Sequence, residues 1–211
     1  MKKYQNILEE ELKNKVAKDF FKKFDCTQIL KRIDFSVKKK DSDEFLLWAE
    51  AKQNANDIYK MLSQLIITIK NDAYDLLPPK YLGCFDYDKI AFVSYYEILP
   101  IFQINDFDWT QSPSNVNEKT VQTVRSVIDK EKIFTFSFDN DSTELKNFIA
   151  ENFSEGGSLL STLVDKNNFI FVYQKWRTNV LPYINADWES LKKKLCHLRP
   201  RFFSCRIKHR W

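Results

Sequence analysis

Apolar residues recur at helical spacing near the start of the chain, at Leu8, Leu12, Val16 and Phe20, with charged residues between them. Steps of four residues place such side chains on one face of a helix. The pattern therefore predicts an amphipathic helix over residues 4–24.

A β-hairpin is predicted after this helix. Residues 29–38 and 44–52 are rich in apolar, β-branched and aromatic side chains. The polar stretch 40–43 between them has the composition of a turn. We expect the turn to centre on Ser42, which fixes the register of the two strands.

The predicted register places two carboxylates side by side. Asp34 faces Glu50, and period-two alternation brings Lys52 to the same face of the hairpin. The other pairs of this register are Ser36 with Trp48, Lys40 with Glu44 and Arg32 with Lys52. The opposite face is expected to be apolar, formed by Ile33, Phe35, Val37, Phe45, Leu47, Ala49 and Ala51. Trp48 and Leu46 share the face of the charged residues, so we expect that face to be partly covered as well.

The rest of the chain alternates predicted helices and strands. A helix is expected from about Asp57 to Lys70 with Asn56 as its N-cap, followed by a loop marked by Pro78-Pro79 and Gly83. The later elements predicted are a strand over 89–96, a helix over 118–130, a strand over 133–138 and a helix over 142–153. Such alternation predicts an α/β fold with a mixed central sheet flanked by helices.

Composition is typical of a folded globular protein. The 211 residues are 15% aromatic and contain only three glycines, which argues against disorder. Two of the glycines fall at Glu155-Gly156-Gly157-Ser158, where we expect a boundary. The predicted organisation is a core over 1–154, a mainly helical extension over 155–195 and a basic tail of doubtful structure over 196–211.

Charge is unevenly distributed along the chain. The net charge is +4, but residues 192–211 carry eight basic groups and no acid, which leaves an acidic body. Residues 1–40 hold twelve basic groups against six acidic ones. A basic excess of this kind suits phosphate binding, and a solvated helix face explains it equally well. Apolar runs are too short to span a bilayer, so we expect a cytoplasmic protein without membrane contact.

The sequence Glu-x-Lys occurs at Glu11, at Glu50 and at Glu144. The first and third fall on predicted helices, where ordinary solvated faces explain them. The second ends an apolar strand whose partner contains Asp34. Two adjacent carboxylates repel one another unless a cation lies between them, and a nearby ammonium stabilises developing charge. This equipment suits metal-assisted phosphodiester hydrolysis; the alternative is an exposed face held by cross-strand ion pairs.

Asp34 followed by Glu50-Ala51-Lys52 in a helix–hairpin–helix setting resembles the PD-(D/E)xK nuclease superfamily. The segments 47–53, 64–68, 89–93 and 105–109 resemble the N-terminal nuclease region of type IIG restriction-modification enzymes, which join a nuclease to an adenine methyltransferase. The resemblance extends over roughly residues 1–190 and implies a restriction-endonuclease-like fold. It departs from the family at Ile33, which stands in place of the motif's proline.

This resemblance implies a site-specific, Mg²⁺-dependent DNA endonuclease that acts on double-stranded DNA and leaves a 5′-phosphate. Asp34, Glu50 and the Ala51 carbonyl would bind Mg²⁺, for which Mn²⁺ can substitute, and Lys52 would activate the attacking water. Gln64 is an accessory candidate, although helical phase places it opposite the apolar stripe. Among the first-helix acids Glu9, Glu10 and Glu11, phase favours Glu9 and the resemblance favours Glu11.

One such site cuts one strand, so a duplex requires either dimerisation on DNA or sequential nicking. No methyltransferase motif is present, and methyltransferase and target-recognition regions are expected only in a longer protein. The alternative from another class is a catalytically silent DNA-binding or protein-interaction module. Zinc is not expected, because Cys196, His197, Cys205 and His209 form a poor half-site pattern. The scattered cysteines indicate reduced thiols, with Cys26 and Cys84 as small buried hydrophobes.

Overall fold

A five-stranded mixed sheet in the order β1-β2-β3-β4-β5 lies at the centre of the molecule. The computed structural model describes residues 2–40, 42–153 and Tyr173. Its strands are β1 (Phe35–Lys38), β2 (Phe45–Ala51), β3 (Tyr81–Phe85), β4 (Lys89–Ser94) and β5 (Ile133–Ser137). Its α-helices are α1 (Glu9–Phe20), α2 (Ile58–Thr68), α3 (Tyr95–Ile98), α4 (Glu118–Val127) and α5 (Ser142–Asn152). The predicted α/β class with a mixed sheet and flanking helices is confirmed.

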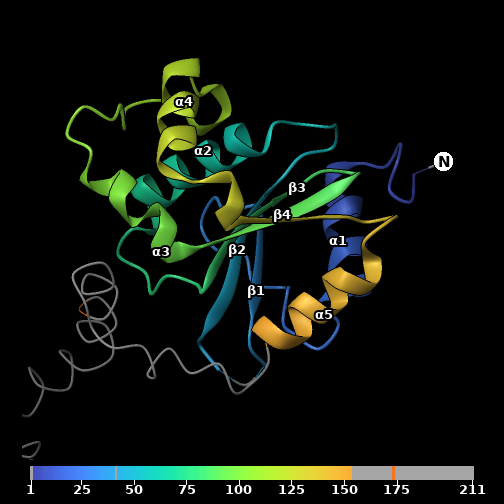
Figure 1. The fold of residues 1–211 in the computed structure, drawn as a ribbon. Coiled ribbons are helices and arrows are strands. Elements are labelled where there is room, and N and C mark those ends of the chain that lie inside the picture. The colour runs from blue at the N-terminus through green and yellow to red at the C-terminus, as the bar shows by residue number, and fades with distance from the viewer. Residues whose placement is uncertain (1, 41, 154–172, 174–211) are drawn as a thin grey trace, which may run out of the picture.

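Helices cover both faces of the sheet. Figure 1 shows α1 and α5 on one side, and α2 and α4 on the other. The α1/α5 side buries Leu12 and Val16 against Leu47 and Ala49 of β2. The α2/α4 side buries a second apolar cluster that includes Trp48. Because both faces are covered, β2 is almost entirely buried, including the charged Glu50.

The only parallel pair among the described strands is β2 with β3, and the chain crosses between them through α2. Strand β3 is absent from the sequence prediction, because Gly83 and the two prolines before it are typical of a loop. Gly83 instead lies in mid-strand, where a Cβ atom would approach Leu47 Cδ1 to 3.0 Å and the Ala91 carbonyl oxygen to 3.1 Å. The glycine allows the neighbouring strands to approach closely.

Helix boundaries differ from prediction at two N-termini. The first helix starts at Glu9 rather than near residue 4, and Leu8 is its N-cap residue with 70% of its surface exposed. The second helix is capped by Asp57 instead of Asn56, because the Asp57 carboxylate accepts a hydrogen bond from the Lys60 backbone N–H. A π-helical turn (Ile69–Ala73) follows α2.

The hairpin register is confirmed away from the turn, where Ser36 lies opposite Trp48 and Phe35 opposite Ala49. It shifts next to the turn, since Lys38 pairs with Phe45 and the Lys39 N–H donates to the Glu44 carbonyl. The predicted pairing of Lys40 with Glu44 is therefore wrong. Leu46, beyond this shift, joins the α1/α5 cluster instead of sharing the face of Trp48.

The first hairpin strand is shorter than predicted. Residues before Phe35 form a tight turn in which the Ile33 N–H donates to the Leu30 carbonyl and Lys31 has a positive φ of 55°. Arg32 accordingly binds Asp72 and does not pair with Lys52. Ile33 and Phe45 were predicted on the same apolar face as Phe35, but both pack on the opposite side of the sheet.

Other expectations have mixed outcomes. The strand over 89–96 and the helices over 118–130 and 142–153 are confirmed, with slightly shorter bounds. Phe134 is 45% exposed on the edge strand β5. Among the described residues no helix is long and apolar enough to cross a membrane. The expected boundary at 155–158, the extension, the basic tail and its zinc candidates lie outside the described residues.

Candidate functional site

Asp34, Glu50 and Lys52 come together at the end of the hairpin far from its turn. Asp34 directly precedes β1, Glu50 is the penultimate residue of β2, and Lys52 follows that strand. Lys52 Nζ lies 2.5 Å from Glu50 Oε1 and 3.7 Å from Asp34 Oδ2. The ammonium group therefore contacts both carboxylates, as expected if the three side chains share one face.

Backbone contacts fix the positions of these side chains. The Ala51 N–H donates to Asp34 Oδ2 at 3.2 Å, which ties the carboxylate to β2. The Lys52 N–H donates to the Phe85 carbonyl at 2.9 Å, which ties the residue after β2 to the end of β3. The site is thus built on strands of the central sheet, which favours precise positioning.

Burial and neighbouring charges control the protonation of Glu50. Its side chain is only 9% exposed, whereas those of Asp34 and Lys52 are 27% and 28% exposed. Burial, followed by repulsion from Asp34, raises the pKa of Glu50 to about 7, against the attraction of Lys52. The pKa of Lys52 is also raised, because Glu50, Asp34 and Glu9 outweigh the opposing effect of burial. The site stabilises positive charge and penalises negative charge.

Glu9 of the first helix interacts electrostatically with Glu50 and Lys52. Burial, followed by repulsion from Asp34, raises the pKa of Glu9, while Lys52 opposes the shift. Glu11 instead forms an ion pair with Lys15 at 2.8 Å and is half exposed. Between Glu9 and Glu11, the electrostatic interaction with Asp34 and Lys52 favours Glu9, the residue indicated by helical phase.

Gln64 does not lie on an exposed face of α2, contrary to the expectation from helical phase. It is 4% exposed, because every residue of the helix from Met61 to Thr68 is buried. Its Oε1 atom has no hydrogen-bond partner among the described residues, and the same is true of Nε1 of Trp48. No hydrogen bond or ion pair joins Gln64 to Glu50 or Lys52 within the described part of the chain.

Sequence reasoning overlooked Asp86, which follows β3 and is fully buried. Its Oδ2 accepts from the Asn56 backbone N–H at 3.1 Å, and its Oδ1 accepts from the N–H groups of Asp88 and Lys89 at 2.8 and 3.1 Å. These bonds connect the turn between β3 and β4 to the segment between Lys52 and α2. A buried carboxylate that accepts several backbone N–H groups is a stable anchor.

A cleft of about 630 Å³ opens beside Asp34, between α1 and the chain leading into β1. Its lining includes Lys13 from the helix and Ile29, Lys31 and Arg32 from the loop. The cleft was not predicted from the sequence, since it depends on the turn that shortens β1. The basic excess of residues 1–40 is the signal that pointed to this region.

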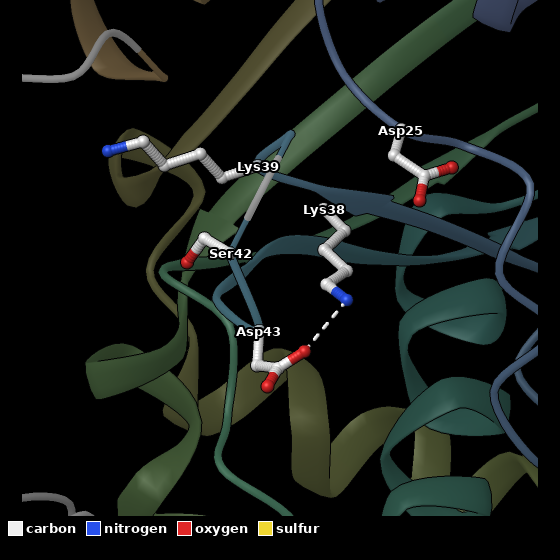
Figure 2. Close-up of a pocket in the computed structure, with 5 residues that line it drawn as sticks. All are labelled: Asp25, Lys38, Lys39, Ser42 and Asp43. Carbon is white, nitrogen blue, oxygen red and sulfur yellow. Dashed lines mark hydrogen bonds and ion pairs between the residues drawn. The ribbon is translucent and has the colours of Figure 1, made fainter.

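A second, smaller pocket of about 290 Å³ lies at the other end of the hairpin, next to its turn. Figure 2 shows Lys38 directed at Asp43, with which it forms an ion pair of 2.9 Å, while Lys39 extends away from this pair. Asp25 completes the lining on the side of the neighbouring chain segment. Mutual neutralisation of Lys38 and Asp43 gives this pocket no clear preference for a charged ligand.

The Asp34 site offers carboxylate oxygens, which are the type of ligand that magnesium prefers. Within the described ranges, no group of three or more His, Cys, Asp or Glu side chains is arranged to hold a metal. Magnesium, however, needs only one or two carboxylates, with waters and substrate phosphate as its remaining ligands. Asp34 and Glu50 supply two carboxylates, and burial makes a cation more favourable beside Glu50.

Comparisons with models of known protein families, with curated proteins and with solved structures found no match to this chain.

Proposed function

We propose that this chain is a restriction-endonuclease-like, Mg²⁺-dependent DNA endonuclease domain with Asp34, Glu50 and Lys52 as its active site. The observation that supports this proposal is the contact of one ammonium group with two carboxylates where β1 begins and β2 ends. The raised pKa of Glu50 also supports it, because an ionised Glu50 is unfavourable at this position unless a cation lies beside it. The resemblance of the sequence to the PD-(D/E)xK superfamily rests on these same three residues.

In this mechanism the carboxylates of Asp34 and Glu50, with the Ala51 carbonyl, would hold Mg²⁺. When bound, the ion supplies neutralisation of the scissile phosphate and Lewis-acid activation. Lys52 Nζ leaves its contact with Glu50 and orients a water, or stabilises the charge that develops on the phosphate. Asp34 lines the cleft, so a substrate that enters the cleft would reach its carboxylate.

Two substitutions at the site test the proposal because they should produce different defects. Glu50→Gln keeps the size of the side chain and removes a charge, so both Mg²⁺ affinity and cleavage should fall. Lys52→Ala should spare Mg²⁺ binding, while cleavage falls on the order of a hundredfold or more. Calorimetry measures the first property, and nicking of supercoiled plasmid measures the second.

The chain provides a matched control in its third Glu-x-Lys sequence. Glu144 and Lys146 lie exposed on α5, so Glu144→Gln and Lys146→Ala should leave metal binding and nicking unchanged. If the parent protein neither binds Mg²⁺ or Mn²⁺ nor nicks DNA, the endonuclease assignment is wrong. The short Lys52–Glu50 ion pair would then be a structural contact in a DNA-binding or protein-interaction module.

A further inference from the structure

Ile29 is the most exposed large hydrophobic residue of the described chain, with 93% of its surface accessible to solvent. It lies on the loop that leads into β1 and lines the same cleft as Asp34. Burying an isoleucine side chain is favourable, so a partner that covers Ile29 would gain binding free energy from it.

The loop around Ile29 is held in place by several contacts. The Ser36 hydroxyl donates to the Gln28 carbonyl at 2.8 Å, and the Ile33 N–H donates to the Leu30 carbonyl at 3.0 Å. Arg32 binds Asp72 through two hydrogen bonds of 2.7 and 3.0 Å. These contacts hold the loop in one conformation in which Ile29 is exposed.

Lys31 adds charge and backbone strain to the same loop. Its φ of 55° is unusual for a residue with a side chain, and such strain is often found at functional positions. Its exposed ammonium group has no hydrogen bond or ion pair with any described residue. One apolar side chain beside an unpaired lysine is a poor centre for a protein interface, which is depleted in lysine, but it suits nucleic acid.

We propose that Ile29 inserts as an apolar wedge between stacked base pairs of duplex DNA, while Lys31 binds the adjacent phosphate backbone. The placement of this DNA next to Asp34 rests on the proposed endonuclease function. Apolar wedges partly unstack a base step and kink the duplex, and they favour steps that deform easily. The loop would then select deformable DNA beside the scissile phosphate.

The test compares binding of the full chain to a short fluorescent duplex and to the same duplex carrying one mismatch, in low salt with EDTA. The parent should prefer the mismatched duplex, because a mismatch lowers the cost of unstacking. Ile29→Ala should abolish that preference by weakening the mismatched complex about tenfold. Lys31→Gln should weaken both complexes equally and reduce the salt dependence by about one ion.

Leu8→Ala is the matched control, because Leu8 is also strongly exposed but does not line the cleft. It should bind both duplexes as the parent does. The wedge is refuted if Ile29→Ala keeps the mismatch preference, or if the parent binds neither duplex, which would favour a protein partner. Binding needs no cleavage, so a mismatch preference without nicking would refute only the endonuclease. Nicking that is independent of Ile29 would refute only the wedge.

Discussion

Glu50→Gln should change the pH dependence of stability, because Glu50 is buried beside Asp34. Burial first, and Asp34 second, raise the pKa of Glu50 from 4.5 to about 7, with Lys52 opposing. Between these values the folded protein binds a proton that the unfolded chain has released. The stability contributed by the protonated group is therefore complete below pH 4.5 and is lost as the pH rises through 7.

The size of this effect follows from the shift in pKa. Each pKa unit corresponds to about 1.4 kcal/mol, so the full loss is about 3 kcal/mol. Glutamine has nearly the shape of protonated glutamate and stays neutral at every pH. Glu50→Gln should match the parent near pH 4 and should exceed its free energy of unfolding by about 3 kcal/mol at pH 8.

Urea unfolding in EDTA, followed by tryptophan fluorescence to which the buried Trp48 contributes, measures this difference at both pH values. Addition of Mg²⁺ at about ten times its Kd should then stabilise the parent by about 1.4 kcal/mol and leave Glu50→Gln nearly unchanged. Glu144→Gln, on the exposed face of α5, should follow the parent throughout. An equal difference between parent and Glu50→Gln at pH 4 and pH 8 would show that Glu50 is not destabilised by its surroundings.

Three further substitutions test the frame around the site by urea unfolding. Gly83→Ala should lower the free energy of unfolding by about 1–3 kcal/mol, because its Cβ would press on Leu47 and the Ala91 carbonyl; an unchanged midpoint would contradict the close approach. Asp86→Asn should cost about 2–4 kcal/mol, since an amide NH₂ group would face backbone N–H donors that now bind a carboxylate. Gln64→Leu should be neutral or stabilising by about 1 kcal/mol, because Oε1 is buried without a partner in the described chain; a large loss of stability would reveal a contact that the geometry does not show.

The site was easier to predict than the strands around it. Strand alternation and the polar turn were enough to bring Asp34, Glu50 and Lys52 to one place, because side chains on adjacent strands repeat every two residues. Helical phase likewise favoured Glu9, whose protonation responds to Asp34 in the folded chain. Local periodicity is sufficient where a site lies on one hairpin and one helix.

Features that depend on distant contacts were not predicted. Gly83 is typical of a loop when only the local sequence is considered. Its place in a strand follows from the close approach of Leu47 and Ala91 on the neighbouring strands. The sequence pattern of α2 predicts that Gln64 is on the surface. It is buried because α2 packs against both the sheet and α4, so that a second layer covers its outer side. The left-handed backbone conformation of Lys31 could not be predicted, because glycine is the residue that usually indicates it and none is present there. The cleft beside Asp34 depends on the turn that contains Lys31.

In the proposed mechanism Asp34 helps to hold the metal ion on which DNA cleavage depends. The most direct measurement follows conversion of supercoiled plasmid to nicked circles in Mg²⁺ by the parent and by Asp34→Asn, with EDTA as the metal-free reference. We expect the parent to nick DNA in a way that EDTA abolishes, and Asp34→Asn to lose activity by about a hundredfold or more with unchanged folding. Equal nicking by the two proteins, or nicking that persists in EDTA, would contradict the proposed mechanism.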